Sequence, residues 1–157
     1  MPNNYENLIK KRCLSKEEIK KILPQREPFL MVDDVINIDL EEKKIIAKRF
    51  IDKQEWYFKG HFPENPVLPG VLIIESMAQT ASILGSLFYK KDNSNEIIVL
   101  AGIDDARFFE IVKPDKEIFI EAKIEKIRNP MFKAQCIVSA NDEKIAQATI
   151  TGFSKKI

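Results

Sequence analysis

The chain has 157 residues, of which 45% are hydrophobic and 31% are charged, and its formal net charge is +1 at pH 7. This length and balance are typical of one globular domain that buries a core without disulfides, and they exclude an intrinsically disordered protein. A net charge so close to zero gives no global attraction for nucleic acid or for an anionic membrane surface.

Few cysteines and a single histidine restrict the kinds of site that the chain can build. Cys13 and Cys136 are too few for a disulfide framework, and one histidine, His61, allows no His/Cys metal cluster. We therefore expect no metal site. The first residues contain no apolar core of a secretory signal, so a reducing cytoplasm is the expected location.

The first third of the chain predicts a short helix and two strands. Ser15 is a good N-cap, and Glu18 three residues later completes a capping-box pattern, so a helix is expected over residues 15–23. Strands are expected over residues 35–40 and 45–51. The polar residues between these two strands indicate a hairpin.

A long apolar segment, residues 70–89, predicts the central helix of the domain. It is nearly long enough to cross a membrane. Glu75 would be costly at membrane depth, however, and the segment also contains Gln79, Thr80 and several serines. The strand patterns on either side need a helix to cover them. We therefore favour a buried helix of a soluble domain, without membrane insertion, over a membrane span.

The remainder of the chain predicts four more strands. An apolar strand is expected within residues 96–109, period-two alternation marks residues 118–125 and 132–140, and a last strand is expected over residues 144–153. We expect these four strands to follow one another in hairpin-like succession. Residues 1–157 should then form one α+β domain, an antiparallel sheet wrapped around one helix. Because so apolar a helix cannot face water, a second subunit is expected to cover part of it.

Residues 60–82 bring three groups with useful chemistry close together in the sequence. His61 lies in a loop stiffened by three prolines, and an imidazole held in a fixed direction can take up a proton near neutral pH. Glu75 is surrounded by apolar residues, so desolvation should raise its pKa and let it donate a proton. Gly70 begins the helix, where unsatisfied N–H groups could stabilise the developing oxyanion of a thioester. Together these groups suit proton abstraction beside a carbonyl, followed by loss of a leaving group.

Each of the three residues also has a plainer interpretation. His61 could be a structural histidine, Glu75 could face solvent or pair with Arg107, and Gly70 could be an ordinary glycine at a helix start. The residues alone leave these alternatives open.

Three segments carry a resemblance to a known family: LPQREPFLMVDDV, GHFPENPVLPGVLIIESMAQ and AGIDDARF. They resemble the FabZ-type (3R)-hydroxyacyl-[acyl-carrier-protein] dehydratases of bacterial type II fatty-acid synthesis, from about Leu23 to the last strand. The resemblance implies a hot-dog fold, in which the sheet wraps the apolar helix. It also implies a homodimer with two active sites at its interface, commonly assembled into a trimer of dimers.

The same resemblance implies roles for the three groups. His61 would remove the C2 proton of the 3-hydroxyacyl thioester, Glu75 of the opposite subunit would help the C3 hydroxyl to leave, and Gly70 would bind the thioester carbonyl. The product would be the trans-2-enoyl thioester, and no metal, nucleotide or other cofactor is needed. Weaker candidates for lining the acyl tunnel, for which core packing is an equal alternative, are Phe62, Pro63, Val71, Phe109 and Phe132.

An acidic acyl carrier protein would be the partner, and it needs a basic landing site. Glutamate rather than aspartate at position 75 favours a dehydratase without isomerase activity. Val99 and Leu100 stand where some FabZ-like proteins have an aromatic gate. Candidates for the landing site are Arg107, Lys113, Lys116, Arg128 and Lys133.

Two other functions fit the same expected fold. A hot-dog acyl thioesterase would hydrolyse the thioester with a carboxylate and a water molecule. A non-catalytic protein could bind the acyl chain without changing it.

Overall fold

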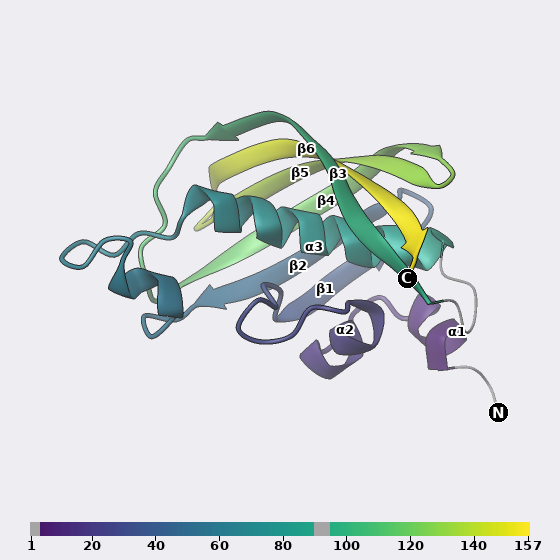
Figure 1. The fold of residues 1–157 in the computed structure, drawn as a ribbon, viewed down its shortest axis with the longest axis horizontal. Helices are drawn as coiled ribbons and strands as arrows, with labels where there is room; N and C mark the ends of the chain where they lie inside the picture. Colours follow the sequence, from purple (N-terminus) through teal and green to yellow (C-terminus); the bar gives the residue numbers. More distant parts are fainter. Residues whose placement is uncertain (1–3, 90–94) are drawn as a thin grey trace.

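The computed structural model describes residues 4–89 and 95–157. Figure 1 shows one long helix lying across the concave face of a curved sheet. This is the expected α+β architecture, an antiparallel sheet wrapped around one apolar helix. The elements in chain order are α1 (Asn4–Ile9), α2 (Lys16–Ile22), β1 (Asp34–Asp39), β2 (Lys44–Ile51), the 3₁₀ helix η1 (Trp56–Lys59), α3 (Gly70–Tyr89), β3 (Glu96–Phe108), β4 (Lys116–Arg128), β5 (Met131–Ala140) and β6 (Glu143–Lys156).

The strand order corrects the expected hairpin succession of the last four strands. The sheet runs β1-β2-β4-β5-β6-β3, so β3 pairs with β6 at one edge and does not pair with β4. Short turns join β4 to β5 and β5 to β6, and in the second turn Asn141 and Asp142 both have positive φ, as a two-residue hairpin turn requires. The β3–β4 connection instead crosses the end of the sheet, which seven residues can span because an extended chain covers about 3.3 Å per residue.

Backbone hydrogen bonds hold this crossing connection in place at both of its ends. The amide of Leu68, just before α3, donates to the carbonyl of Val112 at 2.8 Å. The amide of Asp115 donates to the carbonyl of Ile51 at the end of β2 at 2.7 Å. The connection is therefore fixed against the start of α3 and the end of β2. The strand order leaves β3 as a free edge of the sheet.

The α3 helix is the core helix of the domain. It is long and apolar enough to cross a membrane, but 78% of its apolar window is buried inside the chain. The predicted alternation of β4 and β5 is confirmed, because every second residue is buried over residues 118–124 of β4 and over residues 132–140 of β5. Cys136 is one of these core residues, and burial raises the pKa of its thiol to about 12. The buried residues that face the helix from β4, β5 and β6 include Ile118, Ile120, Ala122, Phe132, Ala134, Cys136, Val138, Ala146, Ala148 and Ile150.

Phe132 fixes the packing of the far end of α3 against the sheet. It is 1% exposed, and its ring lies directly over Gly85 of α3 and Gly152 of β6. A Cβ atom at Gly85 would lie 2.7 Å from Cζ of the ring and closer still to Cε1, which is van der Waals overlap. Phe132 is therefore a core residue, and only glycine fits beside it.

We expect Gly85→Ala to lower the free energy of unfolding by about 1–3 kcal/mol through overpacking. The loss should appear even though alanine in a helix interior is intrinsically favoured over glycine by about 0.5–1 kcal/mol. Gly60→Ala is the matched control, because a Cβ atom there would meet nothing within 4 Å. Urea denaturation of the three proteins measures the difference, and equal midpoints for both variants would contradict the packing argument.

Candidate active site

The His61 loop is closed on itself by three hydrogen bonds. The His61 amide donates to the carbonyl of Tyr57 at 2.9 Å, and the Val67 amide donates to the carbonyl of His61 at 3.0 Å. The imidazole Nδ1 lies 2.8 Å from the carbonyl oxygen of Val67. Because a carbonyl oxygen can only accept, Nδ1 carries a proton, and in the neutral imidazole Nε2 therefore keeps its lone pair. The half-buried ring also stacks on Phe62, with 4.1 Å between the ring centroids.

Glu75 lies half-buried near the start of α3, between the buried residues Ile74 and Ser76. Its Oε1 atom accepts a hydrogen bond of 2.8 Å from Nε2 of Gln79. Burial raises the pKa of Glu75, and the hydrogen bond from Gln79 lowers it by less. The carboxyl group is therefore neither in bulk solvent nor paired with Arg107, whose guanidinium donates to the carbonyl of Ala106. It keeps a proton to higher pH than an ordinary glutamate.

At the start of α3, two amide groups have no acceptor in the part of the chain that the structure describes. The carbonyl of Pro69 accepts from the amides of Leu72 and Ile73, at 2.9 and 3.2 Å. Within the described residues, no hydrogen bond uses the amides of Gly70 or Val71. These N–H groups carry the positive end of the helix dipole and can receive a negatively charged oxygen.

Gly70 also packs closely against β3. A Cβ atom at this position would lie 3.1 Å from Cε1 of Phe108, so a side chain here would require the ring to shift by a few tenths of an ångström. The glycine at the helix start therefore avoids a tight contact with the ring, in addition to any role of its amide.

In one chain the groups do not form a closed site. No hydrogen bond or ion pair among the described residues joins His61 to Glu75. Phe62 and Val71 are 52% and 75% exposed, and Pro63 is exposed as well. Phe109 is also exposed, whereas Phe132 lies in the core, as described above. Among the described residues, the candidates for an acyl tunnel therefore enclose no channel within a single chain.

The basic candidates for a landing site lie in two places. Arg107, Lys113 and Lys116 lie exposed on or beside the β3–β4 connection, near the start of α3. Arg128 and Lys133 lie at the β4–β5 hairpin, where Lys133 pairs with Asp104 at 3.7 Å. Only the first group is close to Gly70 through the contact with Phe108.

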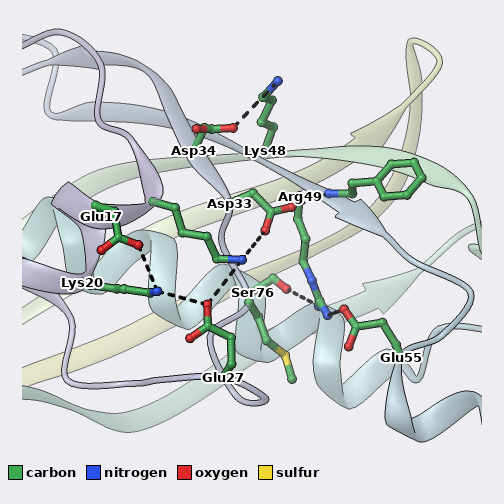
Figure 2. A network of polar contacts seen from close by, with 12 residues as sticks. Glu17, Lys20, Glu27, Asp33, Asp34, Lys48, Arg49, Glu55 and Ser76 are labelled. Carbon is green, nitrogen blue, oxygen red and sulfur yellow. Dashed lines mark hydrogen bonds and ion pairs between the residues drawn. The ribbon is translucent and has the colours of Figure 1, made fainter.

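Two polar groups that support the site were not predicted from the sequence. Arg49 of β2 is 2% exposed, and its guanidinium reaches Glu55, Tyr57 and Ser76 at 3.1, 3.2 and 3.4 Å. Figure 2 shows Arg49 between Glu55 and Ser76. Ser76 follows Glu75 directly on α3. The second group is Gln79. Both groups had a signal in the sequence, because α3 has almost no polar surface. Gln79 is itself a polar residue of this helix, and Ser76, another one, is the partner of Arg49.

Comparison with known proteins places the chain in a family. The model of the FabA-like domain matches residues 23–149. A 3-hydroxyacyl-[acyl-carrier-protein] dehydratase FabZ from Petrotoga mobilis is 44% identical over 140 residues, which are 89% of this chain and 97% of that protein. The FabZ dehydratase of Oceanobacillus iheyensis is 39% identical over 86% of this chain and 94% of its own length.

Solved structures agree on the fold. A dehydratase heterocomplex from Xenorhabdus doucetiae superimposes with a TM-score of 0.71 at 15% identity, covering 88% of this chain and 91% of that chain. A mutant thioesterase from Pseudomonas aeruginosa superimposes with a TM-score of 0.67 at 14% identity, covering 91% and 95% of the two chains. The expected hot-dog fold is confirmed, and it is shared by enzymes with two different reactions.

Proposed function

Because the chain belongs to the FabA-like family, as a dehydratase of the FabZ type, we propose which of its residues perform the reaction and how its subunits assemble around them. The protein is a hydro-lyase that removes water from 3-hydroxyacyl-[acyl-carrier-protein] in fatty-acid biosynthesis. The observation that most supports the residue assignment is the half-buried Glu75 near the start of α3, whose pKa is raised by desolvation.

His61 acts as the base and Glu75 as the acid. The Nε2 lone pair of His61 takes the C2 proton of the 3-hydroxyacyl thioester, and the electron pair of that C–H bond forms the C2–C3 double bond. The C3–O bond breaks as Glu75 gives its proton to the departing hydroxyl, directly or through a water molecule, so that water leaves. The amides of Gly70 and Val71 stabilise the negative charge that develops on the thioester oxygen. A glutamate in the acid position supports dehydration without isomerisation.

The active form is a homodimer in which each site takes His61 from one subunit and Glu75 from the other. β3 supports this assembly, because it is a 13-residue edge strand with an unpaired side, and long exposed edges pair with other chains. Its neighbourhood exposes apolar residues that a partner would cover: Val71, Leu100, Ile103, Phe108 and Ile111. Phe62, Pro63 and Val71 would then line the acyl tunnel between the two subunits.

We extend the proposal to the surroundings of the enzyme. Residues 1–157 act as one domain in the cytoplasm, and the dimers join into a trimer of dimers. The acyl carrier protein docks on the basic residues nearest to Gly70, which are Arg107, Lys113 and Lys116. Their positive charge complements an acidic carrier.

Crotonoyl and 3-hydroxybutyryl thioesters test the reaction. We expect the enoyl absorbance to appear from the hydroxyacyl substrate and to decay from the enoyl substrate, without release of free thiol. Thiol release would instead indicate a thioesterase. Absence of both signals, with binding retained, would indicate a non-catalytic acyl-binding protein.

A further inference from the structure

Gln79 lies one helical turn after Glu75 and is 1% exposed. Its side-chain amide makes three hydrogen bonds. Nε2 donates to the carbonyl of Phe29 at 2.7 Å and to Oε1 of Glu75 at 2.8 Å, and Oε1 accepts from the amide of Met31 at 2.8 Å. Every hydrogen of the amide group therefore has an acceptor, and the amide oxygen has a donor.

The two backbone partners fix the orientation of this amide. The Met31 N–H can only donate, so it must face the Gln79 oxygen, and the Phe29 carbonyl can only accept, so it must face the nitrogen. The second hydrogen of Nε2 then points to Oε1 of Glu75. A flipped amide would place its oxygen against the Phe29 carbonyl oxygen, and its N–H group against the Met31 N–H.

We propose that Gln79 is a positioning residue for the acid: it keeps Oε1 of Glu75 as a hydrogen-bond acceptor, so that Oε2 carries the proton delivered to the substrate. A carbonyl-type carboxyl oxygen accepts a hydrogen bond better than a hydroxyl oxygen, so the protonated acid places its hydroxyl on Oε2. The inference rests on the proposed role of Glu75 as the acid.

The segment that holds Gln79 in place is itself anchored. Phe29 and Met31 belong to the stretch between α2 and β1. Figure 2 shows the ion pair of Glu27 with Lys20 of α2, at 3.3 Å. Glu27 also lies 3.6 Å from Lys16 of the same helix. Further along, Asp33 accepts a hydrogen bond of 2.7 Å from the amide of Phe50 on β2. The direction of the Glu75 carboxyl is therefore coupled to a fixed segment about fifty residues away in the sequence.

No charged group in the described part of the chain pairs with Glu75, so the Gln79 amide is its one polar side-chain partner there. β4, β5 and β6 present apolar residues and the core thiol of Cys136 to α3. The charged or titratable groups on the other surrounding elements have partners of their own. Side-chain partners hold four of them: Arg49 with Glu55 and Tyr57, Lys16 with Glu27 and Asp33, Lys20 with Glu17, and Asp104 with Lys133. Backbone carbonyls hold the other three: Arg26 with Leu23, Arg107 with Ala106, and His61 with Val67.

Gln79→Met tests the proposal, because methionine has a similar length and no hydrogen-bonding amide. We expect kcat to fall about 10- to 100-fold with a smaller change in KM, because the acid loses its fixed direction. Losing a donor to the carboxylate also raises the pKa of Glu75. Dehydration needs the protonated acid, so the alkaline limb of the kcat–pH profile should move to higher pH.

Thr80→Val is the matched control. Thr80 is also fully buried on α3, and its hydroxyl donates only to the carbonyl of Ser76, at 2.8 Å. This variant should lose stability but keep the kcat and the pH profile of the parent. An unchanged kcat and an unmoved alkaline limb in Gln79→Met, with Glu75→Gln inactive, would overturn the positioning role and leave the proposed function intact. A fully active Glu75→Gln would overturn the proposed function itself.

A measurement on the unmodified protein covers the case in which Gln79→Met does not fold. The side-chain amide of Gln79 can be observed by ¹⁵N NMR. Its proton shifts should titrate at the pH of the alkaline limb in the parent and should not titrate in Glu75→Gln. A Gln79 amide signal that is insensitive to pH across the activity range would contradict the proposal.

Discussion

Glu75→Gln is expected to lower kcat by about 10²–10⁴-fold, the range that a general acid contributes. The amide keeps the size of the side chain and can still accept the hydrogen bond from Gln79, so the local structure should stay the same. What it lacks is an acidic proton for the departing hydroxyl. The measurement is the conversion of 3-hydroxyacyl thioester to enoyl thioester at saturating substrate.

Glu125→Gln is the control for this substitution. Glu125 is an exposed residue of β4 without a role in the site, so this variant should have the kcat of the parent. Parent-like turnover in Glu75→Gln would remove Glu75 from the chemistry and leave it as a structural residue.

Glu75→Gln should also be more stable than the parent at neutral pH. Burial raises the folded-state pKa of Glu75 above its unfolded value, so between these two values the native state binds more protons than the unfolded state. The stability of the parent therefore falls as the pH rises through this window and stays lower above it. Glutamine does not titrate, so the Tm difference should be small near pH 4 and should favour Glu75→Gln at pH 7. Such a gain is typical of a catalytic group kept at a cost in stability.

The elements whose signals lie in neighbouring residues could be predicted from the sequence. Ser15 and Glu18 predict a capping box, and the structure has both of its hydrogen bonds at the start of α2. The alternation of β4 and β5 predicts their buried faces, because side chains on a strand point to opposite sides in turn. The apolar length of α3 likewise predicts a buried helix.

Features that depend on distant residues could not be predicted in this way. The position of β3 beside β6 was missed, because alternation shows which face of a strand is buried but not which strand lies next to it. The bonds of Gln79 to Met31 and Phe29 join residues 48 and 50 positions apart. Arg49 and Ser76 are 27 positions apart. The sequence showed polar residues on an apolar helix, but their partners are fixed only when the sheet closes around α3.

His61→Ala and His61→Asn are both expected to lower kcat/KM by about 10²–10⁴-fold, since each removes the base. Asparagine can replace Nδ1 as the donor to the carbonyl of Val67 and so preserve the loop, but it cannot accept the C2 proton. Exchange of the C2 hydrogen with D₂O should disappear in both variants and persist in Lys59→Ala, a change at an exposed position of η1. If His61 were only structural, His61→Asn would restore the activity that His61→Ala loses.

Mixing two inactive variants tests how the site is shared between subunits. A heterodimer of His61→Ala and Glu75→Gln has one site with both substitutions and one site with neither, provided that each site takes its base and its acid from different chains. Random reassociation of equal amounts would make half of the dimers mixed, so about one quarter of the parent activity should return. Recovery should require conditions that allow subunit exchange. If base and acid came from the same chain, every site would keep one defect and no activity would return, because His61 and Glu75 could then never be intact together.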